Sequence, residues 1–290
     1  MFITTIIPTL CEGVRRNALL RAIESVHQAS EQATKILIVV NGQRFDQSLL
    51  NLLKSRNDIE VLQITEGSLT KAHLIGRKHV STEYFSFLDD DDEYLVGALD
   101  IRLALFLNDC TLDVVVTNGF SNRAGNDQQT YSRLINVSAN PLYELFQENW
   151  LHNCNHLFRT SSVPLHYFED PHPYMEWTWL GFRLAVDQKK IFASNTSTFR
   201  YNDTPGSLSK SSMFIASRIA LYQRMLATQL SRDIEGVIQR RLSSAWHDLS
   251  VLELQSGNKT KAIQAHIRSL ISHSSGLKFL SYTRHLLSRP

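Results

Sequence analysis

Short apolar runs alternate with segments of helical period along residues 1–120. The runs expected to be strands are 3–7, 36–40, 59–64, 84–88 and 112–117. The segments with apolar residues at helical spacing are 17–29, 49–53, 69–80 and 95–107. Strands that alternate with helices in this way favour an α/β fold, with a mostly parallel central sheet flanked by helices and built from right-handed crossovers.

The pattern changes after Gly119. Residues 121–130 are polar and predict an exposed loop or hairpin, whereas 140–149 has helical spacing. Aromatic residues, His and Pro are dense in 150–158 and 166–179, a composition typical of the wall of a binding pocket. Beyond these segments the periodic stretches are helical. We therefore expect a chain in three parts, with an all-helical extension as the last: 1–120, 121–212 and 213–290.

The composition is that of a soluble globular protein, with 43% hydrophobic and 20% charged residues in 290. No apolar stretch is long enough to span a bilayer, and the N-terminus lacks the basic and small-residue features of a signal peptide. The three Cys are widely separated and form no CxxC motif, which fits a reducing compartment and argues against a zinc site. These features predict a cytoplasmic protein.

The net charge of +2 conceals an uneven distribution. Residues 213–290 carry eleven Lys and Arg against four Asp and Glu, a net charge of +7, which leaves −5 for residues 1–212. The basic helices could contact an anionic surface, such as the inner face of a membrane, or could be an ordinary solvated helical face. The acidic body argues against nucleic-acid binding, because phosphate contacts dominate the affinity of such proteins.

Four consecutive carboxylates, Asp89 to Asp92, directly follow the apolar run 84–88. In an extended backbone Asp89 and Asp91 would share one side, and Asp90 and Asp92 the other. Like charges a few Å apart repel by ~1 kcal/mol in water and by more near a protein interior, so a compensating group is expected. A divalent cation held by oxygen ligands would compensate them, and open α/β sheets bind ligands at the carboxyl ends of their strands. The alternative interpretation is a solvated acidic loop.

Three segments carry a resemblance to a known family. They are Ile6-Ile7-Pro8-Thr9, the stretch 68–76 (SLTKAHLIG) and the stretch 82–92 (TEYFSFLDDDD). In order and spacing they are similar to blocks of the family 2 glycosyltransferases, which have the Rossmann-like GT-A fold, and the resemblance covers residues 3–210. It implies that residues 1–120 bind a nucleotide sugar and that 121–212 bind the acceptor and supply the catalytic base.

The resemblance also implies that the acidic run binds Mn²⁺ or Mg²⁺, which bridges the diphosphate of the nucleotide sugar. Asp91 would be a direct ligand, Asp89 would bind the metal or the ribose, and Asp92 would support the metal's shell. Asp90 would belong to the nucleotide-sugar site. A cation here would stabilise the diphosphate that leaves when the sugar–phosphate bond breaks.

The nucleotide pocket implied by the resemblance surrounds the ends of the first strands. Its members would be Pro8, Thr9, Leu10, Glu12, Asn41, Lys71 and His73. Asn41 stands where the family usually has Asp, and His73 where it usually has Arg, so Lys71 would supply positive charge to the phosphates. Arg200 and Lys210, in a segment that resembles the family's closing loop, would add to that charge. Lys71 and His73 could instead be surface residues of a helix.

By the same resemblance the catalytic base is Glu176, with Asp170 as the second choice. A carboxylate would take the proton of the attacking hydroxyl, although an acid at a helix N-terminus is also favoured by the helix dipole alone. The acceptor pocket would be formed by His152, Asn153, Tyr174 and Trp177. Packing in the core would explain these aromatic residues equally well.

These features predict an enzyme that moves a sugar, with inversion, from a nucleotide-diphosphate sugar to a hydroxyl of a cell-surface glycan or lipid-linked saccharide. UDP is the expected nucleotide. The alternative is a protein that retains the fold for binding or scaffolding but has lost turnover, which the departures at Asn41, His73 and Thr204 favour. A nucleotidyltransferase is disfavoured, because no Gly-rich phosphate loop follows the first strand. Peripheral contact with the inner face of the membrane through the basic helices, and a homodimer, are further expectations.

Overall fold

The computed structural model describes residues 2–123, 125–202 and 212–288, which form two compact units. The first unit contains residues up to 171 and from 176 to 202, and the second contains 172–175 and 212–288. The short segment 172–175 therefore leaves the first unit and returns to it just before Glu176.

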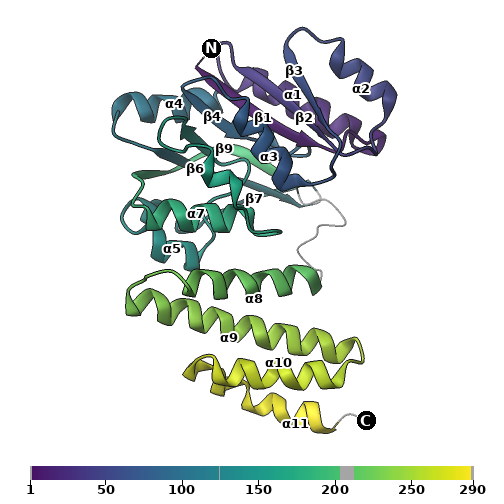
Figure 1. Ribbon diagram of the computed structural model, residues 1–290. Helices are drawn as coiled ribbons and strands as arrows, with labels where there is room; N and C mark the ends of the chain where they lie inside the picture. The colour runs from purple at the N-terminus through teal and green to yellow at the C-terminus, as the bar shows by residue number, and fades with distance from the viewer. Residues whose placement is uncertain (1, 124, 203–211, 289–290) are drawn as a thin grey trace. The chain divides into compact units, whose positions relative to one another are not determined.

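One mixed sheet runs through the first unit (Figure 1). Its strands are β1 (Ile3–Thr9), β2 (Lys35–Asn41), β3 (Ile59–Ile64), β4 (Tyr84–Phe87), β5 (Glu93–Tyr94), β6 (Val114–Arg123), β7 (Asn126–Gln129), β8 (His156–Arg159) and β9 (Ile191–Asn202). The order is β3-β2-β1-β4-β8-β6-β9-β5, and β7 pairs with β6. Strands β3, β2, β1 and β4 are mutually parallel, whereas β8, β5 and β7 join in antiparallel fashion.

The α/β pattern expected for residues 1–120 is confirmed, and the less regular second half adds strands that the sequence did not indicate. The polar segment 121–130 forms the hairpin between β6 and β7, where Gly125 adopts a φ of 86°. The aromatic segment expected as a pocket wall contains β8, and β9 was not predicted as a strand. Both pair with β6, so the second half completes the same sheet.

Helices of the first unit follow the apolar spacing of the sequence. They are η1 (Gly13–Arg15), α1 (Arg16–Gln28), α2 (Gln47–Lys54), α3 (Leu69–Lys78), α4 (Ala98–Asn108), η2 (Leu134–Ser138), α5 (Pro141–Gln147), α6 (His166–Glu169) and α7 (Glu176–Val186). Helix α1 buries Leu19, Ile23 and Val26, which recur at helical spacing. Helix α3 begins at the Ser68 N-cap, whose hydroxyl accepts a hydrogen bond from the Lys71 amide.

Arg102 of α4 joins the two halves of the sheet. Its guanidinium is fully buried and lies 4.7 Å from the centre of the Tyr94 ring. It donates hydrogen bonds to the carbonyl oxygens of Cys154 (2.7 Å) and His156 (3.1 Å) and to the Thr198 hydroxyl (2.8 Å). A buried charge needs such complete pairing, because its desolvation is otherwise strongly unfavourable. The segment before β8 is thereby fixed relative to β9.

The second unit is helical, as expected for 213–290. It consists of α8 (Ser212–Leu226), α9 (Arg232–Gln255), α10 (Lys259–Ile271), η4 (Ser274–Phe279) and α11 (Leu280–Ser288), drawn in green to yellow in Figure 1. Ile219 of α8 packs against Leu242 and Ala245 of α9 in a small core. Across the part of the chain that the structure describes, no helix has the length and hydropathy to cross a membrane.

Candidate active site

The carboxyl ends of β1, β2 and β4 meet at one edge of the sheet. The parallel register pairs Thr9 with Val40 across β1 and β2, and Ile6 with Phe87 across β1 and β4. The loop after β1 and the acidic run after β4 are therefore neighbours. This edge is where open α/β sheets bind ligands.

Asp89 to Asp92 form a turn, so the alternating arrangement expected from an extended backbone is wrong. The Asp92 amide donates a hydrogen bond to the Asp89 carbonyl oxygen at 3.2 Å, which closes the turn. Asp90 and Asp91 consequently face the same cation, Arg15, instead of opposite sides. Nη2 of Arg15 lies 2.8 Å from Oδ1 of Asp90 and 2.6 Å from Oδ2 of Asp91.

Other groups satisfy the two buried members of the turn. Asp90 accepts a hydrogen bond from the Thr9 hydroxyl at 2.5 Å. Asp92 accepts one from the Asn202 amide at 2.9 Å and a longer one from Nδ2 of Asn153 at 3.4 Å. The donors come from the end of β1, from the end of β9 and from the segment before β8. Three separate stretches of chain thus converge on the acidic turn.

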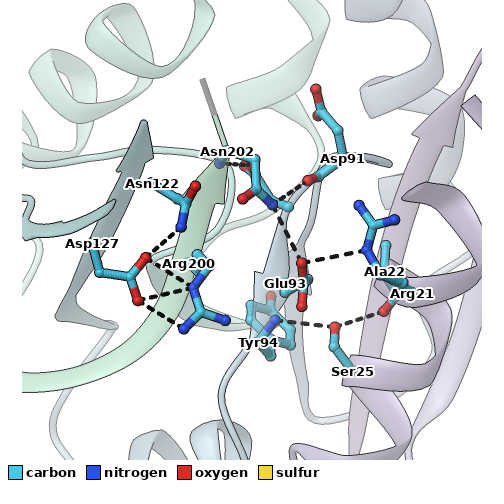
Figure 2. Close-up of polar contacts among 11 residues, drawn as sticks. Arg21, Ala22, Ser25, Asp91, Glu93, Tyr94, Asn122, Asp127, Arg200 and Asn202 are labelled. Carbon is cyan, nitrogen blue, oxygen red and sulfur yellow. Dashed lines mark hydrogen bonds and ion pairs between the residues drawn. The ribbon is translucent and has the colours of Figure 1, made fainter. Parts of the chain in front are cut away.

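Asn202 holds the turn from the side of β9 (Figure 2). Its side-chain Nδ2 donates to the Asp91 carbonyl oxygen at 2.6 Å and to Oε1 of Glu93 at 3.4 Å. Glu93 also lies 3.6 Å from Nε of Arg21 on α1. Figure 2 shows that the Asp91 carboxylate points away from this contact, which leaves the side chain on the opposite side of the turn.

The turn carries more negative charge than its neighbours offset. Burial and then the charges of Asp91 and Asp90 raise the pKa of Asp89 to about 8, and Glu176 contributes to the rise while Arg15 opposes it. Burial also raises the pKa of Asp90, and it raises that of Asp92 well above its usual range. An added cation would relieve this repulsion.

The donor set of the turn fits a hard divalent cation that arrives with a phosphate. Asp90 and Asp92 are buried and held by protein donors, whereas Asp89 and Asp91 are partly exposed. Asp89 and Asp91 are therefore the carboxylates that could face such an ion, with Asp91 also paired with Arg15. Among the described residues, no group of three or more His, Cys, Asp or Glu side chains is arranged to hold a metal by itself. Mg²⁺ is usually bound by one or two carboxylates, with waters and substrate phosphates completing the shell.

The loop after β1 has a fixed conformation beside the turn. The Thr9 hydroxyl accepts a hydrogen bond from the Cys11 amide at 2.9 Å, and the Cys11 carbonyl accepts one from the Asp46 amide at 2.8 Å. Pro8 and Thr9 are the last two residues of β1, whereas Leu10 is 37% exposed and Glu12 is partly exposed. Leu10 and Glu12 are therefore placed to meet a ligand at the edge of the sheet, whereas Thr9 is buried and its hydroxyl is engaged by Asp90.

Asn41 and Lys71 have partners within the protein. Asn41 is buried at the end of β2, and its Oδ1 accepts a hydrogen bond from the Ser68 amide at 2.7 Å. Its side chain thus positions the loop that starts α3. Lys71 is exposed and forms an ion pair with Glu66. Arg200, another expected source of positive charge, pairs with Asp127 at 2.7 Å (Figure 2).

His73 is packed among aromatic rings instead of lying at the surface of α3. The centre of its ring is 5.0 Å from that of Phe87 and 5.3 Å from that of Trp177. Burial lowers the pKa of His73 to about 4, and Nε2 has no hydrogen-bond partner. A neutral imidazole supplies no positive charge to a diphosphate, so Arg15 is the cation that the structure places at the acidic turn.

Glu176 begins α7 and lines a small cavity with Thr70, His73 and Trp177. The space open to a water-sized molecule is about 20 Å³, which is room for one water. The charge of Glu176 contributes to the raised pKa of Asp89, so the two carboxylates lie within electrostatic reach of each other. Asp170 precedes this helix, and its carbonyl oxygen accepts a hydrogen bond from Nε1 of Trp179 at 2.9 Å.

The four residues expected to bind the acceptor do not form one group. Asn153 contacts Asp92, and Trp177 adjoins Glu176 in the wall of the cavity. His152 is buried, and burial lowers its pKa to about 4. Tyr174 belongs to the second unit, where its hydroxyl lies 3.8 Å from the Met213 sulfur. Thr204 and Lys210 lie outside the described residues.

The sequence did not single out Arg15 or Asn202. Arg15 ends the short helix η1 and is adjacent to Arg16, so the local sequence does not show which of the two faces the turn. Asn202 is 110 residues away from Asp92 along the chain. Neither contact could be inferred before the order of the strands was known.

Substituting Arg15 by Gln should lower the free energy of unfolding by about 1–2 kcal/mol, because Asp90 and Asp91 would lose their shared cation. Urea unfolding in EDTA at neutral pH measures this change. Arg16→Gln is the matched control, because it removes the same charge from a side chain whose hydrogen bond reaches Ser48 at 3.5 Å on the exposed surface. Equal effects of the two substitutions would show that Arg15 does not stabilise the turn.

Substituting His73 by Phe should make the protein less sensitive to acid. A folded-state pKa of about 4, against 6.5 in the unfolded chain, means that the unfolded state binds the proton first as the pH falls below 6.5. The wild type should therefore lose about 2 kcal/mol more than the variant between pH 7 and pH 5. Urea midpoints at the two pH values measure the difference, and an unchanged pH dependence would contradict the buried neutral ring.

The sequence of this chain matches the model of one known protein family. The model of the family "Glycosyl transferase family 2" matches residues 4–164. No curated protein sequence gives a significant match.

Solved structures of S. aureus TarS share the fold. The structure of TarS 1–349 in complex with UDP-GlcNAc is 13% identical, with a TM-score of 0.65 over 98% of this chain and 92% of that chain. The complex of TarS 1–349 with UDP is 16% identical, with a TM-score of 0.64 over 99% and 88%. The longer TarS structure is 14% identical, with a TM-score of 0.61 over 96% of this chain and 55% of that chain.

The family match covers more than half of the sequence, and the structural matches extend over the helical extension as well. Together they confirm the predicted GT-A fold class. The chain belongs to glycosyl transferase family 2 and is a glycosyltransferase.

Proposed function

We propose that this enzyme transfers a sugar from a UDP-sugar to a hydroxyl acceptor, and that it binds the donor with a divalent cation at Asp91 and Asp89. The observation that carries this proposal is the acidic turn itself, which gathers carboxylates at the ligand-binding edge of the sheet with an excess of negative charge. The TarS structures with UDP and UDP-GlcNAc support the choice of UDP. They make UDP-GlcNAc the first donor to test.

The chain's own residues would position the donor in three ways. Asp91 and Asp89 would hold Mn²⁺ or Mg²⁺, which supplies Lewis-acid stabilisation of the diphosphate when bound. Leu10 and Glu12 would contact the nucleotide at the end of β1. Arg15 already faces the turn, and its guanidinium has donors to spare for a phosphate oxygen beside Asp91.

Glu176 would act as the base. The acceptor hydroxyl attacks the anomeric carbon, its proton passes to the Glu176 carboxylate, and the bond from that carbon to the diphosphate oxygen breaks, which releases UDP. A single displacement of this kind inverts the anomeric centre. The proximity of Glu176 to Asp89, seen in its effect on the Asp89 pKa, supports this assignment because the base must lie close to the donor. A hydroxyl of a cell-surface glycan or lipid-linked saccharide is the proposed acceptor.

Donor binding can be tested without knowing the acceptor. UDP with Mn²⁺ should stabilise the protein, by ~2.7 kcal/mol at a hundredfold excess over Kd, whereas GDP should not. Asp91→Asn should abolish the part of the thermal shift that depends on Mn²⁺. Asp58→Asn is the control, since Asp58 is an exposed carboxylate paired with Arg56 on the surface. A wild-type protein that responds to no nucleotide, or an unchanged response in Asp91→Asn, would contradict the proposed site.

The base assignment can be tested by the release of UDP from UDP-GlcNAc with a panel of saccharide acceptors. Glu176→Gln should lower kcat by roughly 10²–10⁴-fold and leave the affinity for UDP unchanged, because it removes only the proton acceptor. Asp170→Asn is the competing variant and should retain most of the activity. The reverse result, with activity lost in Asp170→Asn and kept in Glu176→Gln, would assign the base to Asp170.

A further inference from the structure

Helix α10 has its apolar residues distributed in an unusual way. The side that packs within the second unit buries small or polar residues, namely Ala262, Ala265, His266 and Ser269. The large apolar residues Ile267 and Ile271 are 51% and 76% exposed. Ile263 and Leu270, the other large apolar residues of α10, are half-buried. Single exposed apolar residues are ordinary, but two on one side of a helix, four residues apart, require a reason.

Exposed apolar residues also occur on the next two elements, η4 and α11, which follow α10 directly. Gly276 of η4 lies so close to the end of α10 that a Cβ on it would be 2.2 Å from the Ser269 carbonyl oxygen and 3.0 Å from the Leu270 Cα. Leu277 follows this contact directly and is 59% exposed. Leu280 is 52% exposed, and its spacing of three residues from Leu277 matches the period of a 3₁₀ helix. We call Ile267, Ile271, Leu277 and Leu280 the apolar patch.

The segment that carries the apolar patch is basic, whereas Glu253 of the neighbouring helix α9 lines a hollow together with Lys261 and Arg268. Between Leu254 and Pro290 the sequence has six Lys and Arg and no Asp or Glu. Arg268 follows Ile267, and Lys278 follows Leu277, and both are exposed. Their charged groups lie over aromatic rings, with the Arg268 guanidinium carbon 4.6 Å from the centre of the Trp246 ring and Lys278 Nζ 4.7 Å from that of Phe279. The apolar patch is therefore bordered by positive charges that no acid in its own segment offsets.

We propose that the apolar patch docks the protein on the surface of an anionic lipid bilayer. Apolar side chains that enter the boundary between headgroups and acyl chains, with Lys and Arg beside them, are the features by which proteins lie on such a surface without spanning it. Each basic residue near an anionic membrane contributes attraction worth roughly a fivefold change in affinity. A symmetric contact with a second copy fits less well, because it would place two surfaces of the same positive charge face to face.

Vesicle sedimentation tests the proposal with the full chain. Binding to vesicles of phosphatidylcholine with phosphatidylglycerol should be at least tenfold tighter than to phosphatidylcholine alone, and it should weaken as salt is raised. The double variant Ile271→Gln, Leu277→Gln should bind the anionic vesicles at least tenfold more weakly. Both positions are exposed, so far-UV circular dichroism and the thermal midpoint should match those of the wild type.

The matched control is Val96→Gln, Leu107→Gln, which replaces two residues of the first unit that are 78% and 71% exposed. It should bind vesicles as the wild type does. Equal binding to neutral and anionic vesicles, or equal loss in both double variants, would overturn the proposal. So would a wild-type dimer in the absence of lipid that the Ile271→Gln, Leu277→Gln variant converts to a monomer, because a second copy would then cover the apolar patch. Since donor binding plays no part in this assay, its outcome is independent of the proposed function.

Discussion

The constraint on which the structure of the site depends is the close packing of four consecutive carboxylates at the end of a buried strand. Asp90 and Asp92 are almost completely enclosed, at 4% and 1% exposure, so each must be met by donors or a cation. The protein provides these from Thr9, Arg15, Asn153 and Asn202. The sheet order β1-β4-β8-β6-β9 is what brings the four elements that carry them to one edge.

The contacts within the turn indicate which kind of ligand would compensate its remaining negative charge. Asp90 and Asp92 are used to build the turn, and the pKa of Asp89 is raised first by its burial and then by the charges of Asp91 and Asp90, which Arg15 only partly offsets. A cation that brought its own phosphate ligands would correct this imbalance, and that is the form in which a nucleotide-diphosphate sugar would arrive. Asn41 and His73, which differ from the residues usual in the family, do not contribute charge at the turn. Asn41 supports the start of α3, His73 is neutral, and positive charge at the turn comes from Arg15.

The parallel half of the fold could be predicted from sequence because each element there has a clear local period. The run 36–40 is apolar throughout, as a strand buried on both faces must be, and it forms the centre of β2. The second half was harder to predict, since β8 and β9 combine polar and aromatic residues and are defined by their pairing with β6.

At the site, the acidic run was identified from its position after a strand. Its turn, and the contacts of Arg15 and Asn202, depend on residues far apart in the chain and were not predicted. Tyr174 was expected to share an acceptor pocket with Trp177, although the segment 172–175 belongs to the other unit.

The most direct test of the central claim is anomalous diffraction from crystals grown with UDP and Mn²⁺. A manganese peak should appear in direct coordination with the Asp91 carboxylate and an oxygen of the diphosphate, at the carboxyl ends of β1 and β4. Bound UDP with no manganese at the acidic turn, or manganese bound at a different place, would show that Asp89–Asp92 is a structural turn and that the enzyme activates its donor by other means.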